Sequence, residues 1–188
     1  GGAVKDKKPA WSLVHFRAAR KYLLNKTVIS ADDVVTYAAL AVGWQVLLRR
    51  SEFCQPVKKY REHDTSFNTH IHLSRASVRW FKNGGAEITD VTEKAMRDLV
   101  DGDYCTLRLG VSKTDQTGVK YGWQPVVLLF SASAEVNAAR EIAKLELVRP
   151  CRAGAERESR PLFEVSRPRR GGARRLQGKE MKRWGDAE

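Results

Sequence analysis

The longest uncharged stretch of the chain, Val34 to Leu48, places the strongest constraint on the fold. A helix that spans a membrane needs about 20 apolar residues, so this stretch is too short, and Thr36, Gly43 and Gln45 interrupt its apolar character. Its apolar residues lie almost all round the expected helix, so other elements must pack against several of its faces. We therefore expect a buried core helix in a globular domain, and no membrane partner.

The residues that flank this stretch indicate where the helix begins and ends. Ser30 stands before Asp32 and Asp33, which supplies a capping hydroxyl and two carboxylates at the positive end of the helix. Arg49 and Arg50 follow the stretch and suit the negative end. The pattern predicts one long helix that starts directly after Ser30.

Two segments in the middle of the chain are typical of paired β-strands. Tyr104–Val111 and Val119–Phe130 are rich in β-branched, aromatic and aliphatic residues, and residues 112–118 form a polar turn with a late glycine between them. The continuous apolar run Val126–Phe130 is expected to be buried on both faces of the sheet. Pro125 indicates an edge or a bulge just before that run.

Weaker patterns supply the rest of an α+β fold. Helical spacing and capping residues predict helices over residues 11–24, 76–82 and 134–144, and one that follows a capping box at residues 90–93 and runs to residue 100; alternation predicts a strand over residues 67–73. We expect a single α+β domain, residues 11–148, with about four helices and a small antiparallel sheet. Residues 1–10 are expected to be a flexible basic N-terminus.

Positive charge is concentrated toward the C-terminus. The chain carries 34 Lys and Arg against 22 Asp and Glu, a formal net charge of +12. Residues 149–188 hold 12 of the basic and 6 of the acidic side chains, so 40 residues carry the same net charge, +6, as the 148 residues before them. Ser166–Arg175 contains no apolar residue larger than Ala, and such a segment does not fold alone. We predict a basic, Arg-rich C-terminal tail from residue 149 onward, largely extended or disordered by itself.

Several functional classes are excluded by the sequence. Three cysteines (Cys54, Cys105 and Cys151) are too few for a four-thiolate zinc site and cannot form a closed disulfide framework, which favours an intracellular reducing compartment. The chain has no Gly-x-Ser-x-Gly turn, no phosphate-binding loop and no Gly-x-Gly-x-x-Gly fingerprint. No cofactor is expected.

His70 and His72 form the one pattern that suggests an active site. Residues two apart on a strand project from the same face, so both imidazoles can share a metal ion, as in rolling-circle and relaxase-type nucleases. Such an enzyme also needs a carboxylate ligand and a nucleophilic Tyr, and Tyr104 and Tyr121 lack the helical context with a following Lys. Two ordinary histidines on a polar strand face are a far more common cause of a three-residue pattern than a metal site. No catalytic residue is therefore predicted, and a metal-dependent nuclease or phosphoesterase is kept as an alternative.

Cations and aromatic residues together predict a nucleic-acid-binding surface. Lys and Arg bind phosphates through charge, and Arg adds a bidentate fork. The outward alternates Tyr104, Tyr121 and Trp123 can stack on unpaired bases, unless Tyr121 and Trp123 face the core instead. The predicted nucleic-acid-binding residues are Lys58, Lys59, Arg61, Arg79, Lys82, Tyr104, Arg108, Lys113, Lys120, Tyr121, Trp123, Arg167, Arg169, Arg170, Arg174, Arg175, Lys182 and Arg183.

These observations favour a non-catalytic RNA-binding protein, with electrostatic affinity from the tail and shape or stacking contacts from the core. RNA is preferred to duplex DNA because no helix-turn-helix, zinc-finger or basic-zipper pattern occurs. Viral nucleic-acid-binding proteins and organellar ribosomal proteins carry such tails, and either role would bring protein partners in a ribonucleoprotein or in self-assembly. A third hypothesis, beside the RNA-binding protein and the metal-dependent enzyme, is a protein-interaction module that binds an acidic partner.

Overall fold

The centre of the structure is a buried helix, α2 (Ala31–Gln45), where the uncharged stretch predicts one. The Asp33 amide donates to the Ser30 hydroxyl (3.2 Å) and the Ser30 amide donates to the Asp33 carboxylate (3.0 Å), so the expected cap is confirmed. All eight residues from Val35 to Val42 are buried. The computed structural model describes residues 12–48, 67–69, 71–110, 125–151, 154–166 and 173–176.

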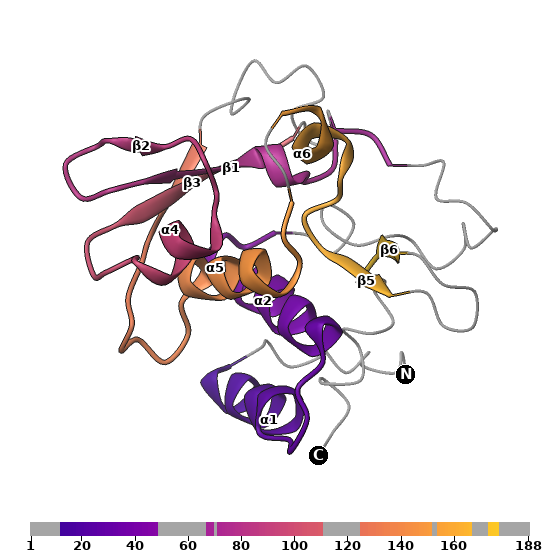
Figure 1. The fold of residues 1–188 in the computed structure, drawn as a ribbon. Helices are drawn as coiled ribbons and strands as arrows, with labels where there is room; N and C mark the ends of the chain where they lie inside the picture. The colour runs from indigo at the N-terminus through magenta and orange to yellow at the C-terminus, as the bar shows by residue number, and fades with distance from the viewer. Residues whose placement is uncertain are drawn as a thin grey trace, which may run out of the picture.

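Four further helices surround or extend this centre. Helix α2 packs most extensively on α5, and α1 packs on the other side of α2, away from the sheet (Figure 1). In the described part of the chain, no helix is long and apolar enough to cross a membrane. The four helices are α1 (Leu13–Leu24), α4 (Glu93–Arg97), α5 (Ala138–Val148) and α6 (Ala155–Ser159).

A four-stranded antiparallel sheet forms the second layer, with the order β2-β1-β3-β4. Helices α2, α4 and α5 lie on one face of this sheet (Figure 1). The protein is thus a single α+β domain, as the sequence predicts. The strands are β1 (Val78–Phe81), β2 (Glu87–Ile88), β3 (Tyr104–Arg108) and β4 (Pro125–Leu129).

Strand β3 alternates as expected, and strand β4 alternates as well, with Leu128 buried between exposed Val127 and Leu129. Cys105 and Leu107 are fully buried against the helices, so the even-numbered residues of β3 point away from them. The expectation that β4 is buried on both faces is wrong, because Val127 is 56% and Leu129 65% exposed. The cause is that the helices cover only one face of the sheet, in which β4 is an edge strand, as Pro125 indicates.

The helix expected over residues 76–82 is also wrong. A 3-10 turn, Arg75–Ser77, leads into strand β1, in which Val78 and Trp80 are buried and alternate with exposed Arg79. The Asn-Gly-Gly that follows is the turn between β1 and β2. Its glycines have φ values of +104° and +92°, which a tight β-hairpin requires.

Part of the predicted tail belongs to the core. Residues 149–188 contribute α6, β5 (Glu164–Ser166) and β6 (Ala173–Arg175), and they bury Leu162, Phe163, Val165 and Leu176. The amide of Ser166 donates to the Asp32 carboxylate at the start of α2 (3.0 Å). The boundary placed at residue 149 is therefore corrected: the domain continues through residue 166 and includes residues 173–176. Residues 167–172 and 177–188 lie outside the described part.

A buried ion cluster joins this C-terminal part to the rest. Glu146 of α5 accepts hydrogen bonds from Arg75 (2.8 Å) and from Arg157 (2.7 Å), and the Arg75 and Glu146 side chains are at most 1% exposed. Burial lowers the pKa of the Arg75 guanidinium, which the Glu146 carboxylate opposes. Arg157 also donates to the carbonyl of Arg75 (3.0 Å). The Glu146 carboxylate of α5 is thus the shared counter-charge for the guanidinium groups of Arg75, in the 3-10 turn, and Arg157, in α6.

The Asp103 carboxylate holds together the turns at one end of the sheet. We expect Asp103→Asn to lower the free energy of unfolding by about 2 kcal/mol at pH 7. Its buried carboxylate accepts from Lys82 Nζ (2.8 Å) and from the amides of Asn83 (2.9 Å) and Val100 (3.0 Å). An asparagine has one oxygen, so its NH2 group would face a donor.

The pH dependence distinguishes this effect from lost packing. Burial alone would raise the pKa of Asp103, but the hydrogen bonds from Lys82, Val100 and Asn83 outweigh it and hold the pKa below its usual value. The stabilisation is complete above the ordinary pKa of about 3.9 and is lost as pH falls through the lower, folded-state value. Urea denaturation at pH 7 and pH 3 should show the difference between wild type and variant shrinking; an unchanged difference would contradict the assignment.

Candidate nucleic-acid interface

The sheet face opposite the helices carries three rows of side chains, which the strand register defines. Phe81 of β1 pairs with Tyr104 of β3, and Tyr104 pairs with Leu129 of β4. The next row is Arg79, Thr106 and Val127, and Arg108 pairs with Pro125 beyond it. We call these eight residues the open face; they are Arg79, Phe81, Tyr104, Thr106, Arg108, Pro125, Val127 and Leu129.

The open face contains a stacked aromatic pair. The Phe81 and Tyr104 rings are nearly parallel, with an interplanar angle of 11° and centroids 5.1 Å apart. The Arg79 guanidinium lies 5.6 Å from the Phe81 ring centroid, within the range of a cation–π interaction. Both rings are only half-buried, and Leu129 beside them is exposed. This row therefore presents apolar and aromatic surface to solvent.

A groove of 480 Å³ adjoins the open face where β3 ends and β4 begins. Arg79, Thr106 and Arg108 form its sheet side, and Glu158 of α6 also lines it. Ser74 and Ser77, at the 3-10 turn, belong to the lining too, but both are buried. Arg79 is paired with Glu87 on β2, which lowers the pKa of Glu87 through a hydrogen bond to the carboxylate. The groove thus combines two guanidinium groups and the Thr106 hydroxyl, which are groups that contact phosphate and sugar, with one carboxylate.

Lys82 does not contribute to this surface as predicted, and His72 does not lie on the strand predicted for it. Lys82 donates to the Asp103 carboxylate and to the Asp98 carbonyl (both 2.8 Å), so its ammonium group is engaged in holding the turns. His72 does not lie on a strand: residues 67–69 and 71–73 form turns and bends, and the Asn68 amide donates to His72 Nδ1 (3.0 Å).

The metal-site alternative loses its geometric basis. The shared-face argument for His70 and His72 required a strand, and His70 itself lies outside the described residues. Where the chain is described, no group of three or more His, Cys, Asp or Glu side chains could hold a metal ion. The histidine pair therefore carries no functional argument here.

The structure describes few of the predicted nucleic-acid-binding side chains. It places Arg79, Tyr104 and Arg108 together on the open face and assigns Lys82 to the Asp103 contact. Arg174 and Arg175 lie in β6, with only their backbone described. The predictions that lie outside the described residues are Lys58, Lys59, Arg61, Lys113, Lys120, Tyr121, Trp123, Arg167, Arg169, Arg170, Lys182 and Arg183.

Net positive charge is divided unevenly between the two parts of the chain. The described residues hold 17 Lys and Arg and 14 Asp and Glu, a net charge of +3, while the remaining residues hold 17 and 8, a net charge of +9. Of the 15 cations whose side chains are described, twelve form ion pairs. The described part of the domain is close to electrostatic balance, so most of the net positive charge belongs to the segments joined to it.

Sequence reasoning missed Phe81, Val127 and Leu129. Phe81 was assigned to a helix, and the two β4 residues were expected to be buried. The alternation of Val78, Arg79, Trp80 and Phe81 is the signal that identifies Phe81 as outward-facing once the segment is recognised as a strand.

Comparison of the chain with known protein families, with curated proteins and with solved structures gave no match. The geometry and chemistry of the open face are therefore the basis for assigning a function.

Proposed function

We propose that this protein binds single-stranded nucleic acid, RNA in particular, on the open face of its sheet. The observation that carries the proposal is the stacked Phe81–Tyr104 pair, half-exposed beside Val127 and Leu129 on a face that no described element covers. An apolar face of this kind, bordered by two arginines, needs a partner with both flat apolar and anionic groups. Unpaired bases on a phosphate backbone have both.

Stacking would supply the affinity that does not depend on charge. Each base stacked on an aromatic side chain contributes about 1–3 kcal/mol, and every base has a π-face, so the contribution tolerates many sequences. Bases in a duplex are already stacked and cannot lie flat on Tyr104. The open face therefore favours a single strand over a duplex.

The basic segments would supply the charge-dependent affinity. Residues 111–124 connect β3 to β4, so Lys113, Lys120, Tyr121 and Trp123 belong to a connection that leaves and returns beside Arg108 and Pro125. Residues 167–172 connect β5 to β6 and contain Arg167, Arg169 and Arg170. Cations that neutralise phosphates release counterions, which makes binding salt-dependent.

A charge-neutralising pair tests the second contribution. In Arg169→Gln/Arg170→Gln we expect the slope of log affinity against log salt to fall by about 1.4 in magnitude, because each lost phosphate contact on a single strand contributes about 0.7. Fluorescence anisotropy with a labelled 12-nucleotide RNA measures this slope. Deleting residues 149–188 is unsuitable, since it would remove buried Leu162 and Phe163 and unfold the domain.

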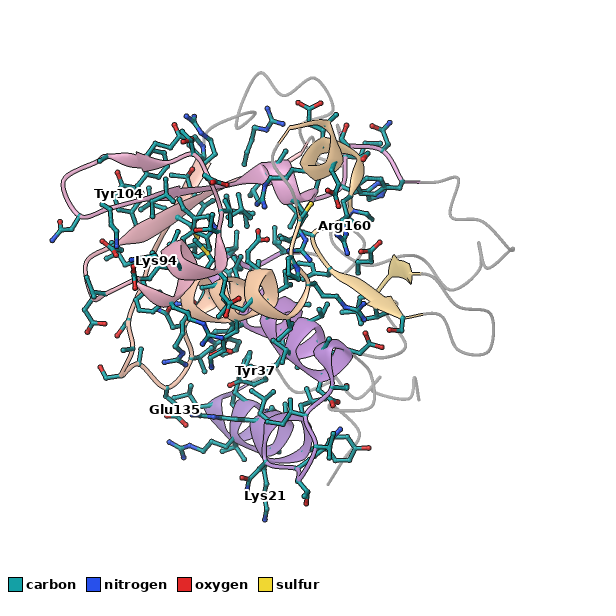
Figure 2. All side chains as sticks on the ribbon, in the orientation of Figure 1. Lys21, Tyr37, Lys94, Tyr104, Glu135 and Arg160 are labelled. Atoms are coloured by element: carbon teal, nitrogen blue, oxygen red, sulfur yellow. The ribbon has the colours of Figure 1, made fainter. Side chains whose placement is uncertain are left out.

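Lys94→Gln/Arg97→Gln on α4 is the matched control. It removes the same charge from exposed cations that pair with Asp98 and Glu93 on the helical side of the sheet (Figure 2). The control slope should equal the wild-type slope. Equal slopes in all three proteins would contradict a role for the β5–β6 connection. Duplex DNA that binds as tightly as single-stranded RNA and DNA, or polyglutamate that competes as well as RNA, would contradict the proposed function itself.

A further inference from the structure

A second groove lies between α1 and the α2–α5 layer, away from the open face. It has a volume of 640 Å³. Phe16 and Leu24 of α1 and Val34 and Tyr37 of α2 form its floor, and Ile29, 47% exposed, stands at its border. Figure 2 shows Tyr37 between α1 and the layer above it, with Glu135 beside α1. The floor is therefore apolar and continues to an exposed aliphatic side chain.

The rim of this groove is basic. Arg17, Arg20, Lys21 and Lys144 line it together with a single carboxylate, Glu135. Arg17 pairs with Glu135 (2.5 Å) and Lys144 with buried Glu141 (3.1 Å). Arg20 and Lys21 form no ion pair with any described acidic side chain. The four cations and one carboxylate give the lining a net charge of +3, which is complementary to an acidic ligand.

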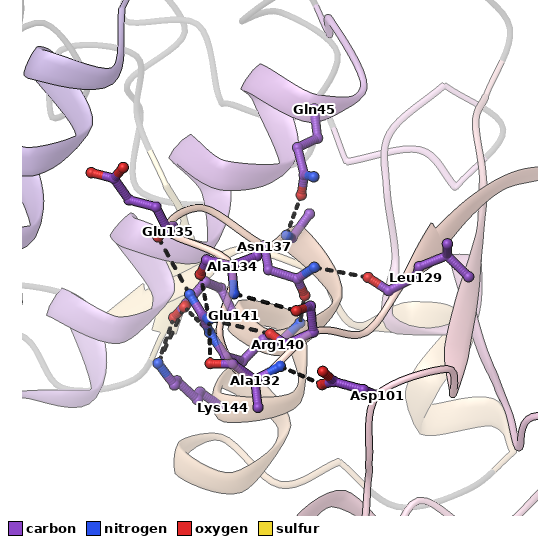
Figure 3. Close-up of polar contacts among 12 residues, drawn as sticks. Gln45, Asp101, Leu129, Ala132, Ala134, Glu135, Asn137, Arg140, Glu141 and Lys144 are labelled. Carbon is purple, nitrogen blue, oxygen red and sulfur yellow. Dashed lines mark hydrogen bonds and ion pairs between the residues drawn. The ribbon is translucent and has the colours of Figure 1, made fainter.

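The wall opposite α1 is held in place by hydrogen bonds. Arg140 of α5 donates to the carbonyls of Ala132 (2.9 Å) and Ala134 (2.7 Å), and its Nε donates to Glu141 (2.9 Å) (Figure 3). These contacts fix the loop that carries Glu135. The groove is thus shaped before any ligand arrives, which reduces the ordering cost of binding.

The Tyr37 side chain belongs to the floor of the groove and carries a hydroxyl group. Tyr37 is 1% exposed and is one of the residues that line the groove. Burial raises the pKa of Tyr37, so the hydroxyl stays protonated and can donate. A ligand carboxylate or carbonyl that reaches the floor can accept a hydrogen bond from it.

We propose that this groove binds an acidic segment of a protein partner, which inserts an apolar side chain beside Leu24 and Ile29 and places carboxylates against Arg20 and Lys21. Nucleic acid fits the groove less well. The Phe16 and Tyr37 rings are each 1% exposed and so offer no face on which a base can stack. The site is separate from the open face and does not depend on the function proposed for it.

The test uses the full chain and a fluorescein-labelled 15-residue peptide, three repeats of Glu-Leu-Glu-Asp-Phe, in fluorescence anisotropy at 150 mM salt. We expect Arg20→Gln/Lys21→Gln to weaken peptide binding roughly fivefold, and the uncharged substitution Ile29→Ser to weaken it by about tenfold through loss of an apolar contact. These three side chains are exposed, so the variants should fold. Lys94→Gln/Arg97→Gln, with the same loss of charge on α4, should stay within about twofold of wild type.

Two results would overturn the proposal. The first is binding that depends on net charge alone. It would be seen if a peptide with Ser in place of Leu and Phe bound as tightly as the original peptide, or if Arg20→Gln/Lys21→Gln and Lys94→Gln/Arg97→Gln weakened binding equally. The second is a loss of single-stranded RNA affinity in Arg20→Gln/Lys21→Gln that exceeds the loss in the α4 control, because the groove would then be part of the nucleic-acid surface.

Discussion

Replacing Glu146 by Gln is expected to lower the free energy of unfolding by about 3–5 kcal/mol, the largest stability effect of any single substitution considered for this protein. The substitution keeps the shape of the side chain but removes the one carboxylate that contacts both Arg75 and Arg157 in the interior. Two guanidinium groups would then be buried without a counter-charge. Domains of this size have a total stability of about 5–15 kcal/mol, so the variant should be close to unfolding.

Urea denaturation followed by circular dichroism measures this effect. Glu158→Gln, an exposed glutamate on α6, is the matched control and should leave the midpoint unchanged. The triple variant Arg75→Met/Glu146→Leu/Arg157→Met removes the whole ion cluster and should recover much of the lost stability, because apolar replacement of a buried ion cluster is often neutral or stabilising. If the triple variant is as unstable as Glu146→Gln, the cost comes from packing and not from unpaired charge.

The helical centre of the fold was predictable because its signals are local. The Ser30 cap, the carboxylate of Asp33 and the uncharged run after them lie within one stretch of sequence. The alternation of Tyr104, Cys105, Thr106 and Leu107 likewise predicts which side of β3 faces the core. Each of these patterns depends on a single element, and the structure contains each one.

The remaining features depend on contacts between distant parts of the chain. Whether helices cover one face of the sheet or both depends on the packing of distant elements, so the exposure of Val127 and Leu129 could not be predicted from an apolar run (Figure 1). The tail illustrates the same limit, because Arg149 and Arg157 increase its apparent charge but bind Asp32 and Glu146. Composition gives the number of cations in a segment but not which of them form ion pairs in the folded protein.

The candidate site was predicted in part for the same reason. Tyr104 and Arg108 were identified from alternation within β3, but the ring that stacks on Tyr104 comes from β1, and only the strand register places Phe81 opposite it. The Asn-Gly-Gly after β1 suits a helix end as well as a hairpin turn, which is why β1 was assigned to a helix. A β assignment there would have identified Phe81.

Phe81→Ala/Tyr104→Ala is expected to weaken binding of single-stranded RNA by about 10- to 100-fold, since one stacked base contributes about 1–3 kcal/mol. Neither substitution changes a charge, so the slope of log affinity against log salt should match that of wild type. The Phe81→Ala/Tyr104→Ala variant should thus lose affinity with an unchanged salt slope, whereas in Arg169→Gln/Arg170→Gln the slope itself should fall. Both rings are half-buried on the outer face of the sheet, so the core beneath them is retained.

Tyr22→Ala provides the matched loss of an aromatic side chain. Tyr22 lies on α1, away from the sheet, and is 58% exposed. The variant should bind RNA with wild-type affinity. The urea midpoint of each variant, measured in parallel, shows whether the protein is folded under the binding conditions.

The most direct measurement is the dissociation constant of the full chain for a 12-nucleotide single-stranded RNA at 150 mM salt, compared between wild type, Phe81→Ala/Tyr104→Ala and Tyr22→Ala. Binding on the open face requires the dissociation constant to rise at least about tenfold in the first variant and to stay at the wild-type value in the second. A folded Phe81→Ala/Tyr104→Ala protein that binds the RNA as tightly as wild type would contradict the proposal that the open face is the nucleic-acid interface.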